Sequence, residues 1–402
     1  MARPRAGQDL PGEHCAQAVP EHAGGPRNEG EVVALPVESQ PVLAPISAAA
    51  VFLVVRIEPG GEQGVRDVLE NLAGLVRSVG FRVPNGSLSC VAGIGSEAWD
   101  RLFSGPRPAE LHPFQQLVGP RHTAPATPGD LLFHIRSRRM DQSFELASQI
   151  VKQLGAAASV LDEVHGFKYF DERDLLGFVD GTENPAGLAA ITAVLITEEQ
   201  DADFTGGSYV IVQKYVHDLA AWNGLTVEQQ ERAIGRSKLE DIETPDELKA
   251  PDSHVSLNTI EEDGVQRQIV RDNMPFGRVG AGEFGTYFIG YCATPSVTEQ
   301  MLRNMFLGKP PGVTDRILDF STAVTGCLFF TPSADFLDDL PPLPGTAAEQ
   351  VRPSAAAPAA IPTPFIPGAG AGPENEAEGA ELAGGLGDGS LGIGSLDRST
   401  AS

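Results

Sequence analysis

Strand-like apolar runs alternate with helix-like segments through the middle of the chain, and the alternation occurs twice. The strand-like runs are residues 50–57, 88–92, 131–135, 208–212 and 285–292. Apolar side chains at helical spacing mark residues 64–76 and 144–154, and Ser296 with Glu299 three positions later forms the capping-box pattern of a further helix. Two units of similar size predict two related α+β halves that close around one core.

Segments without such periodicity flank this region. Residues 1–38 are rich in Pro, Gly, Glu and Ala and predict a disordered N-terminal extension. Residues 339–387 are rich in Pro, Ala and Gly and predict a flexible linker to a short segment at 388–402. The predicted folded domain is therefore 39–338, with halves at approximately 45–165 and 205–335.

Composition limits the classes of partner. The 402 residues, 41% of them hydrophobic, are enough for a substantial core, and 29 Lys and Arg against 54 Asp and Glu give a net charge of −25. This charge repels nucleic acid and anionic membranes, so neither is an expected partner. The longest apolar stretch, roughly 48–55, is too short to span a bilayer, and the four scattered cysteines suggest no disulfide framework. These features favour a cytoplasmic protein.

One acidic side chain, Asp180, lies in a glycine-hinged segment, residues 177–185, that reads GFVDGTENP. The segment resembles the GxxDG signature of dye-decolorising peroxidases, which are haem enzymes that reduce hydrogen peroxide, and the resemblance runs from about Gln40 to Asp335. It is closest to the B-type enzymes. It implies an α+β fold of two ferredoxin-like halves, whose antiparallel sheets pack as a barrel-like sandwich with peripheral helices.

The same resemblance implies the activity. A member of this family binds one haem b per chain, reduces hydrogen peroxide through a ferryl intermediate, and oxidises dyes, phenols or similar one-electron donors. It also implies a homo-oligomer.

The proximal iron ligand is predicted to be His254, because residues 252–259, DSHVSLNT, match the family segment that carries this histidine. A haem-ligating imidazole usually donates its other N–H to a carboxylate. The resemblance assigns that carboxylate to Asp315, with Asp319, one helical turn later, as the alternative. A solvated acid on an amphipathic helix is the structural alternative for both.

The distal residues are predicted to be Asp180, Arg271 and Asn273, the last two from the segment 267–277. Asp180 is suited to move a proton between the two peroxide oxygens. Arg271 stays protonated and is suited to stabilise negative charge, and Asn273 to position water or peroxide. The alternative for Asp180 and Arg271 is a buried salt bridge that only holds the loop.

Two further side chains, Arg236 and His217, are candidates for contacts with the haem propionates, because a buried carboxylate needs a cationic or hydrogen-bonding partner. Ordinary surface charge is the alternative reading for both.

The final segment contains the apolar residues Leu391, Ile393 and Leu396 behind the long linker. It resembles the cargo-loading peptide that docks peroxidases inside encapsulin shells, although Asp397 stands where family peptides commonly carry a basic residue. The resemblance implies an encapsulin shell protein as partner and a location inside an encapsulin nanocompartment.

Two other classes of function are compatible with the sequence. One is a haem-binding storage or sensor protein of the same fold without significant turnover. The other is a haem-free α+β interaction module delivered to a shell. Retention of haem and reaction with peroxide distinguish the three.

Overall fold

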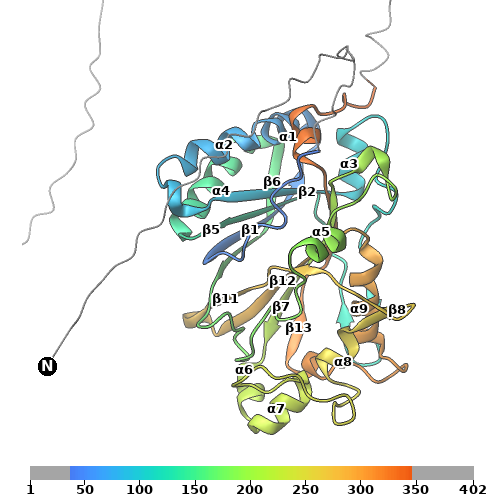
Figure 1. Cartoon of the computed structure of the whole chain (residues 1–402). Coiled ribbons are helices and arrows are strands. Elements are labelled where there is room, and N and C mark those ends of the chain that lie inside the picture. The colour runs from blue at the N-terminus through green and yellow to red at the C-terminus, as the bar shows by residue number, and fades with distance from the viewer. Residues whose placement is uncertain (1–36, 346–402) are drawn as a thin grey trace, which may run out of the picture. The chain divides into compact units, whose positions relative to one another are not determined.

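Antiparallel strands form the framework of the described part of the chain, residues 37–345, in the computed structural model (Figure 1). Nearly all of the predicted N-terminal extension and most of the predicted linker lie outside these residues. So does the docking segment with Leu391, Ile393 and Leu396. Within residues 37–345 no helix has the length and apolar character needed to cross a bilayer.

The N-terminal half is an antiparallel sheet in the order β2-β5-β1-β6 with helices on one face (Figure 1). Its strands are β1 (Ala49–Ile57), β2 (Ser89–Gly95), β5 (Leu131–Ser137) and β6 (Ala158–Phe167), and its main helices are α1 (Glu62–Glu70), α2 (Leu72–Gly80) and α4 (Met140–Leu154). Strand β1 is apolar on both faces because each face enters a core: Leu53 packs with the helices, whereas Phe52 packs toward the C-terminal half.

The C-terminal half has the same arrangement, in the order β10-β12-β7-β14. Its elements are β7 (Ser208–His217), β10 (Val270–Arg271), β11 (Met274–Arg278), β12 (Glu283–Cys292), α9 (Pro295–Leu307), β13 (Ser321–Ala323) and β14 (Cys327–Thr331). In both halves the first strand of the unit lies between the third and the fourth, and the second strand lies beside the third. This is the ferredoxin-like order, and the predicted α+β fold of two ferredoxin-like halves is confirmed.

The two halves share one ten-stranded sheet, because β14 pairs with β2 through Phe329 opposite Gly95 and Phe330 opposite Ile94. On the other side, β6 lies against β11: a Cβ added to Gly166 would sit 2.5 Å from the Cβ of Met274. No strand pairing joins β6 to β11 among residues 37–345, so the described sheet is barrel-like without closing into a ring.

The connections between these strands carry further short helices and strands, and α10 (Ala334–Asp338) follows β14. Those in the connections are α3 (Ser96–Leu102), β3 (Leu117–Val118), β4 (Thr123–Ala124), α5 (Leu188–Val194), α6 (Leu219–Asn223), α7 (Val227–Ile234), α8 (His254–Asn258), β8 (Ile260–Glu262) and β9 (Val265–Arg267). Most of those that bear on the candidate site, α6 to α8 with β8 and β9, come from the long connection between β7 and β10.

Two helix details differ from the sequence prediction. The helix predicted at 64–76 is two helices, because Asn71 adopts φ −90° and ψ 0° between α1 and α2. Helix α9 begins at Pro295, and its cap is Thr294, whose hydroxyl accepts a hydrogen bond from the Ser296 amide. The predicted cap at Ser296 is therefore wrong, since a proline in the first turn and an extended threonine before it make an earlier start.

Candidate functional site

A cavity of about 180 Å³, counted as the space open to the centre of a water molecule, lies in the C-terminal half. Side chains of β12 and α9, including Phe288 and Leu302, form apolar walls. Six predicted site residues line this cavity: Asp180, His217, Arg236, His254, Arg271 and Asn273. Residues from five different segments therefore meet at one place.

His254 is oriented by a buried carboxylate. It is the first residue of α8, which Ser253 caps, and its Nδ1 donates to Asp315 Oδ2 at 2.8 Å. Asp315 is 1% exposed, and its second oxygen accepts from the Ile317 amide at 3.0 Å. The carboxylate fixes the ring with its proton on Nδ1, so Nε2 is the atom left for a ligand in the cavity.

The alternative carboxylate, Asp319, is occupied elsewhere. Its Oδ1 accepts from Arg121 at 2.6 Å and from His122 Nε2 at 3.0 Å, at the turn between β3 and β4. Arg316 completes this ion cluster at 3.2 Å. Asp315 thus contacts His254, whereas Asp319 forms ion pairs with the N-terminal half.

Asp180 is held by Asn273, whose side-chain amide donates to both carboxylate oxygens at 3.0 and 3.2 Å. The amide oxygen of Asn273 in turn accepts from the Ile289 backbone at 3.0 Å, so β12 fixes the pair. Gly181, with φ +79°, provides a left-handed turn directly after Asp180. No hydrogen bond or ion pair between Asp180 and Arg271 is present in the described structure, so the salt bridge considered as an alternative is absent there.

Arg271 is fixed by its backbone and leaves its guanidinium to the cavity. Its amide donates to Asn184 Oδ1 at 2.9 Å, and its carbonyl accepts from Asn184 Nδ2 at 2.7 Å. Within residues 37–345 the buried Arg271 Nε has no hydrogen-bond partner. A buried donor without a partner is unusual in a folded protein and fits a site whose acceptor comes from a bound group.

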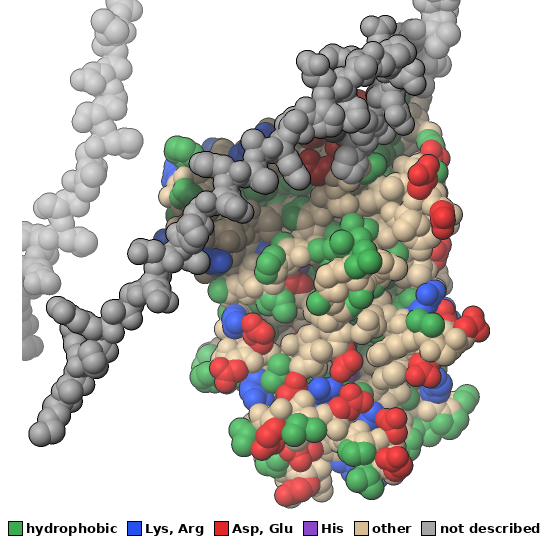
Figure 2. Space-filling model, in the orientation of Figure 1, with side chains coloured by type: hydrophobic (Ala, Val, Ile, Leu, Met, Phe, Trp, Pro, Cys, Tyr) green, Lys and Arg blue, Asp and Glu red, His purple; other side chains and the backbone are tan. Residues whose placement is uncertain are grey.

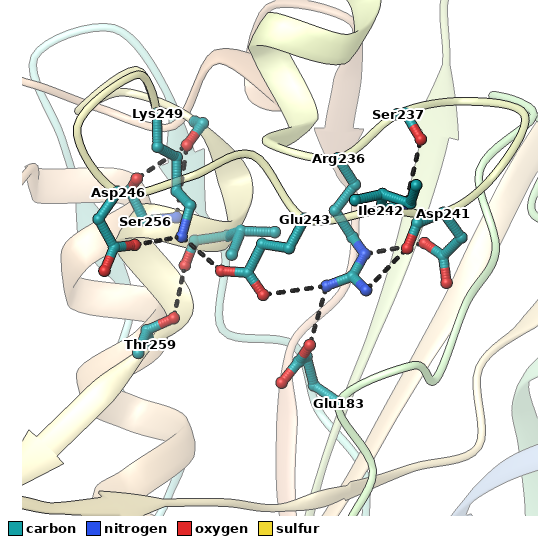
Figure 3. A network of polar contacts seen from close by, with 12 residues as sticks. Glu183, Arg236, Ser237, Asp241, Ile242, Glu243, Asp246, Lys249, Ser256 and Thr259 are labelled. Carbon is teal, nitrogen blue, oxygen red and sulfur yellow. Dashed lines mark hydrogen bonds and ion pairs between the residues drawn. The ribbon is translucent and has the colours of Figure 1, made fainter.

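Arg236 lines the cavity and contacts several acidic side chains (Figure 3). Its guanidinium donates to Asp241 at 2.8 Å, to Glu183 at 2.9 Å and to Glu243 at 3.2 Å. Lys249 binds Glu243 from the other side. Figure 2 shows acidic and basic side chains mixed over this end of the molecule, where α6 and α7 lie. The charge of Arg236 is thus already offset, and its contact with a propionate stays a prediction.

His217 is an uncharged part of the wall. Its Nδ1 is 2.8 Å from Ser321 Oγ and its Nε2 is 3.0 Å from Thr286 Oγ1. Burial lowers the pKa of His217 to about 4, so the ring is neutral at pH 7. The predicted propionate contact would require one of these hydroxyl hydrogen bonds to be exchanged.

The sequence did not predict two residues of the loop at 174–184, which carries Asp180. Asn184 joins the loop to Arg271, and its presence inside the segment 177–185 was the only signal for it. Asp174 also lines the cavity; burial and the negative charge of Asp180 raise the pKa of Asp174 to about 7. Nothing in its local sequence distinguishes Asp174 from the acids beside it.

Comparison with known proteins decides the family. Residues 39–168 match the model of the Dyp-type peroxidase N-terminal region, and residues 171–336 match that of the C-terminal region. The chain belongs to the Dyp-type peroxidase family. The resemblance predicted from the sequence is confirmed, and with it the peroxidase class.

Similar proteins agree over nearly their whole length. A dye-decolorizing peroxidase from Rhodococcus erythropolis is 59% identical over 368 residues, which are 91% of this chain and 99% of that protein. The encapsulated DyP-type peroxidase from Mycobacterium smegmatis has 63% identity and a TM-score of 0.75, over 76% of this chain and 99% of that one. A variant of DypB from Rhodococcus jostii RHA1 in complex with haem has 57% identity and a TM-score of 0.74, over 75% and 98%.

Proposed function

We propose that this family member is a haem-dependent peroxidase that reduces hydrogen peroxide and oxidises dyes, phenols or similar donors in two one-electron steps. The observation that carries the proposal is that His254, which Asp315 orients, lines one cavity together with Asp180, Arg271 and Asn273. The haem-bound DypB relative supports the choice of cofactor.

The residues present fit a haem. His254 Nε2 is available for the iron, and the apolar walls from α9 and β12 suit a porphyrin. The buried Arg271 Nε, unpartnered within residues 37–345, suits an acceptor on a bound group. Bound haem supplies the redox chemistry of peroxide reduction. Asp315 accepts a hydrogen bond from the Nδ1–H of His254, which makes the ring a stronger electron donor. One haem b per chain is proposed on this basis.

The distal residues handle the proton and the charge. Asp180 takes the proton from one peroxide oxygen and returns it to the other, which leaves as water. Asn273 donates hydrogen bonds to both oxygens of Asp180 and so fixes the orientation of this carboxylate. The guanidinium of Arg271 stabilises the negative charge that develops as the O–O bond breaks.

The test is an absorption spectrum of haem-supplemented protein before and after one equivalent of peroxide. Wild type is expected to bind haem and to change its spectrum with peroxide. His254→Ala is expected to lose haem, whereas Asp180→Ala and Arg271→Ala bind haem and react slowly. Haem retention without any reaction would support the storage or sensor alternative, and failure to retain haem would support the haem-free module.

We also propose that residues 388–402 dock the enzyme inside an encapsulin shell in the cytoplasm, behind the linker at 339–387. The encapsulated relative from M. smegmatis supports this. Leu391, Ile393 and Leu396 are the proposed contacts, and a homo-oligomer of the 39–338 domain is the proposed cargo. Deleting 391–402 is expected to abolish co-purification with the shell and to leave peroxidase activity intact; a truncated protein that still co-purifies would contradict the proposal.

A further inference from the structure

A buried ion pair lies behind the strand segment that carries two of the distal residues. Arg271 and Asn273 line the cavity, whereas Asp272 between them faces the interior and is 3% exposed. Asp272 Oδ2 accepts from Arg136 Nη1 at 2.6 Å. Arg136 comes from β5 of the N-terminal half and is fully buried. One arginine of the N-terminal half thus contacts the segment 271–273, which carries two of the three distal residues.

The same guanidinium also binds a third segment, the stretch before β1. Arg136 donates to the carbonyls of Pro41 and Ala44, the latter at 3.3 Å, in the stretch before β1. Its Nε and Asp272 Oδ1 have no hydrogen-bond partners within residues 37–345, so the pair is incompletely satisfied. Because a buried ion pair is often no more stabilising than apolar side chains of similar size, stability alone does not account for it.

A neutral histidine sits beside the pair. His134 Nδ1 is 2.8 Å from Tyr291 Oη, and its Nε2 is 3.8 Å from Asp272 Oδ2. Burial, and then the charge of Arg136, hold the pKa of His134 well below its usual value. Among the described side chains, Arg136 is therefore the cation that neutralises Asp272.

The pair is electrostatically linked to the site. Burial raises the pKa of Asp272, Arg136 lowers it, and the negative charge of Asp180 raises it again. The electrostatic repulsion between the two carboxylates acts on both of them. The charged and titratable groups around the pair are His134, Tyr291, Cys90 and Asp180. Those around Asp180 include Asp174, Asp272, Arg271, Lys168, Tyr169, Glu172, Arg173 and Glu183.

We propose that Arg136 is a positioning residue for the distal site: through its ion pair with Asp272 it holds Arg271 and Asn273 in the cavity wall and sets the electrostatic potential at Asp180. The inference rests on the proposed peroxidase function for its catalytic meaning. The predicted catalytic residues all lie in the loop at 174–184 and in the C-terminal half. The proposal therefore gives the N-terminal half a role in the same reaction.

Three variants separate charge from structure. Asp272→Asn leaves the buried charge of Arg136 unbalanced and favours ionisation of Asp180, so the acid limb of the pH profile of kcat/KM for peroxide moves down by about one pH unit. Arg136→Met leaves the buried Asp272 without its cation, and Asp272 then takes up a proton, so the limb moves less. Arg136→Met combined with Asp272→Leu removes both charges and returns the limb close to its wild-type position.

A second readout does not depend on turnover. The urea midpoint of each protein is compared with that of its Asp180→Asn counterpart from pH 4 to 8, which reports the ionisation of Asp180 through its linkage to unfolding. The pH dependence of this difference is expected to move in the same directions as the kinetic limb. Arg66→Met is the matched control, because Arg66 is also buried in the N-terminal half and binds backbone carbonyls of Leu102 and Pro341.

Arg66→Met is expected to lower stability without moving either pH dependence. If Asp272→Asn behaves like this control, the pair is only structural and the inference is wrong. A wild type that does not react with peroxide would instead overturn the proposed function, and the unfolding comparison would still test the link between Arg136 and Asp180.

Discussion

Asp315 and Asp319 are four positions apart in one short segment, yet they face different parts of the molecule. Asp315 touches His254, and Asp319 touches Arg121 and His122. This makes them a matched pair for testing the carboxylate beside the predicted iron ligand, because the same substitution at either position removes one charge from the same segment.

Asp315→Asn is expected to lower haem affinity by about 10- to 100-fold, since a hydrogen-bonded partner of a metal ligand contributes on that order. Loss of the carboxylate charge also makes His254 a weaker donor, so the reduction midpoint of the bound iron rises. Absorbance titration with haem and spectroelectrochemistry measure the two effects. Asp319→Asn is the control and leaves both unchanged; equal losses in the two variants would show that the segment matters only as a whole.

The buried, neutral His217 is expected to make the free energy of unfolding depend on pH in the acid range. Its folded-state pKa of about 4 lies below the ordinary value of 6.5, so between these pH values the unfolded chain takes up a proton that the folded chain does not. Stability present above pH 6.5 is therefore lost as the pH falls toward 4, by up to roughly 3 kcal/mol. His217→Gln keeps a hydrogen-bonding side chain and is expected to flatten this loss. Urea unfolding at pH 7 and pH 4.5 measures it, and parallel losses in the two proteins would contradict the assignment.

At the scale of single elements, the sequence located the strands well because their apolar runs are buried. Strand β1 was predicted at 50–57 and lies at Ala49–Ile57, and β12 was predicted at 285–292 and lies at Glu283–Cys292. The largest miss is β6, whose burial is mixed because it lies at the edge of the described sheet, so its sequence has no clean apolar pattern.

Site residues that lie in a recognisable sequence motif could be predicted. Residues that reach the site only through the packing of the fold could not. Asp180, His254 and Arg271 lie in recognisable segments, whereas Arg136 reaches Asp272 from a strand of the other half. Such a contact depends on how the two halves pack, which no local pattern records. The sequence does not decide between Asp315 and Asp319 for the same reason, since the choice depends on which way one 3-10 turn faces.

The start of α9 gives a prediction for an element. Thr294→Ala removes the hydroxyl that accepts from the Ser296 amide and is expected to destabilise the protein by about 1 kcal/mol. Ser296→Ala tests the cap that the sequence suggested and should cost less. Urea denaturation of both variants decides between the two caps; a larger loss for Ser296→Ala would restore the sequence-based assignment.

At the scale of the whole molecule, the β14–β2 junction unites the two halves. A Cβ added to Gly93 on β2 would lie 2.9 Å from the Cβ of Phe329 on β14. Gly93→Ala is therefore expected to overpack the junction and cost about 1–3 kcal/mol in unfolding free energy. Gly280→Ala is the control, because a Cβ there meets nothing within 4 Å. Equal unfolding midpoints for the two variants would show that the junction can relax.

This junction also has a consequence for how the chain acquires its structure. Gly95 pairs with Phe329, so the two strands come from opposite ends of the described chain. Contacts between such distant positions form late, because the entropy cost of closing a long loop comes before the stabilisation that the contacts provide. Until then one edge of β14 and one edge of β2 remain open to other molecules. Refolding from urea should accordingly be slow, and its yield should fall as the protein concentration rises.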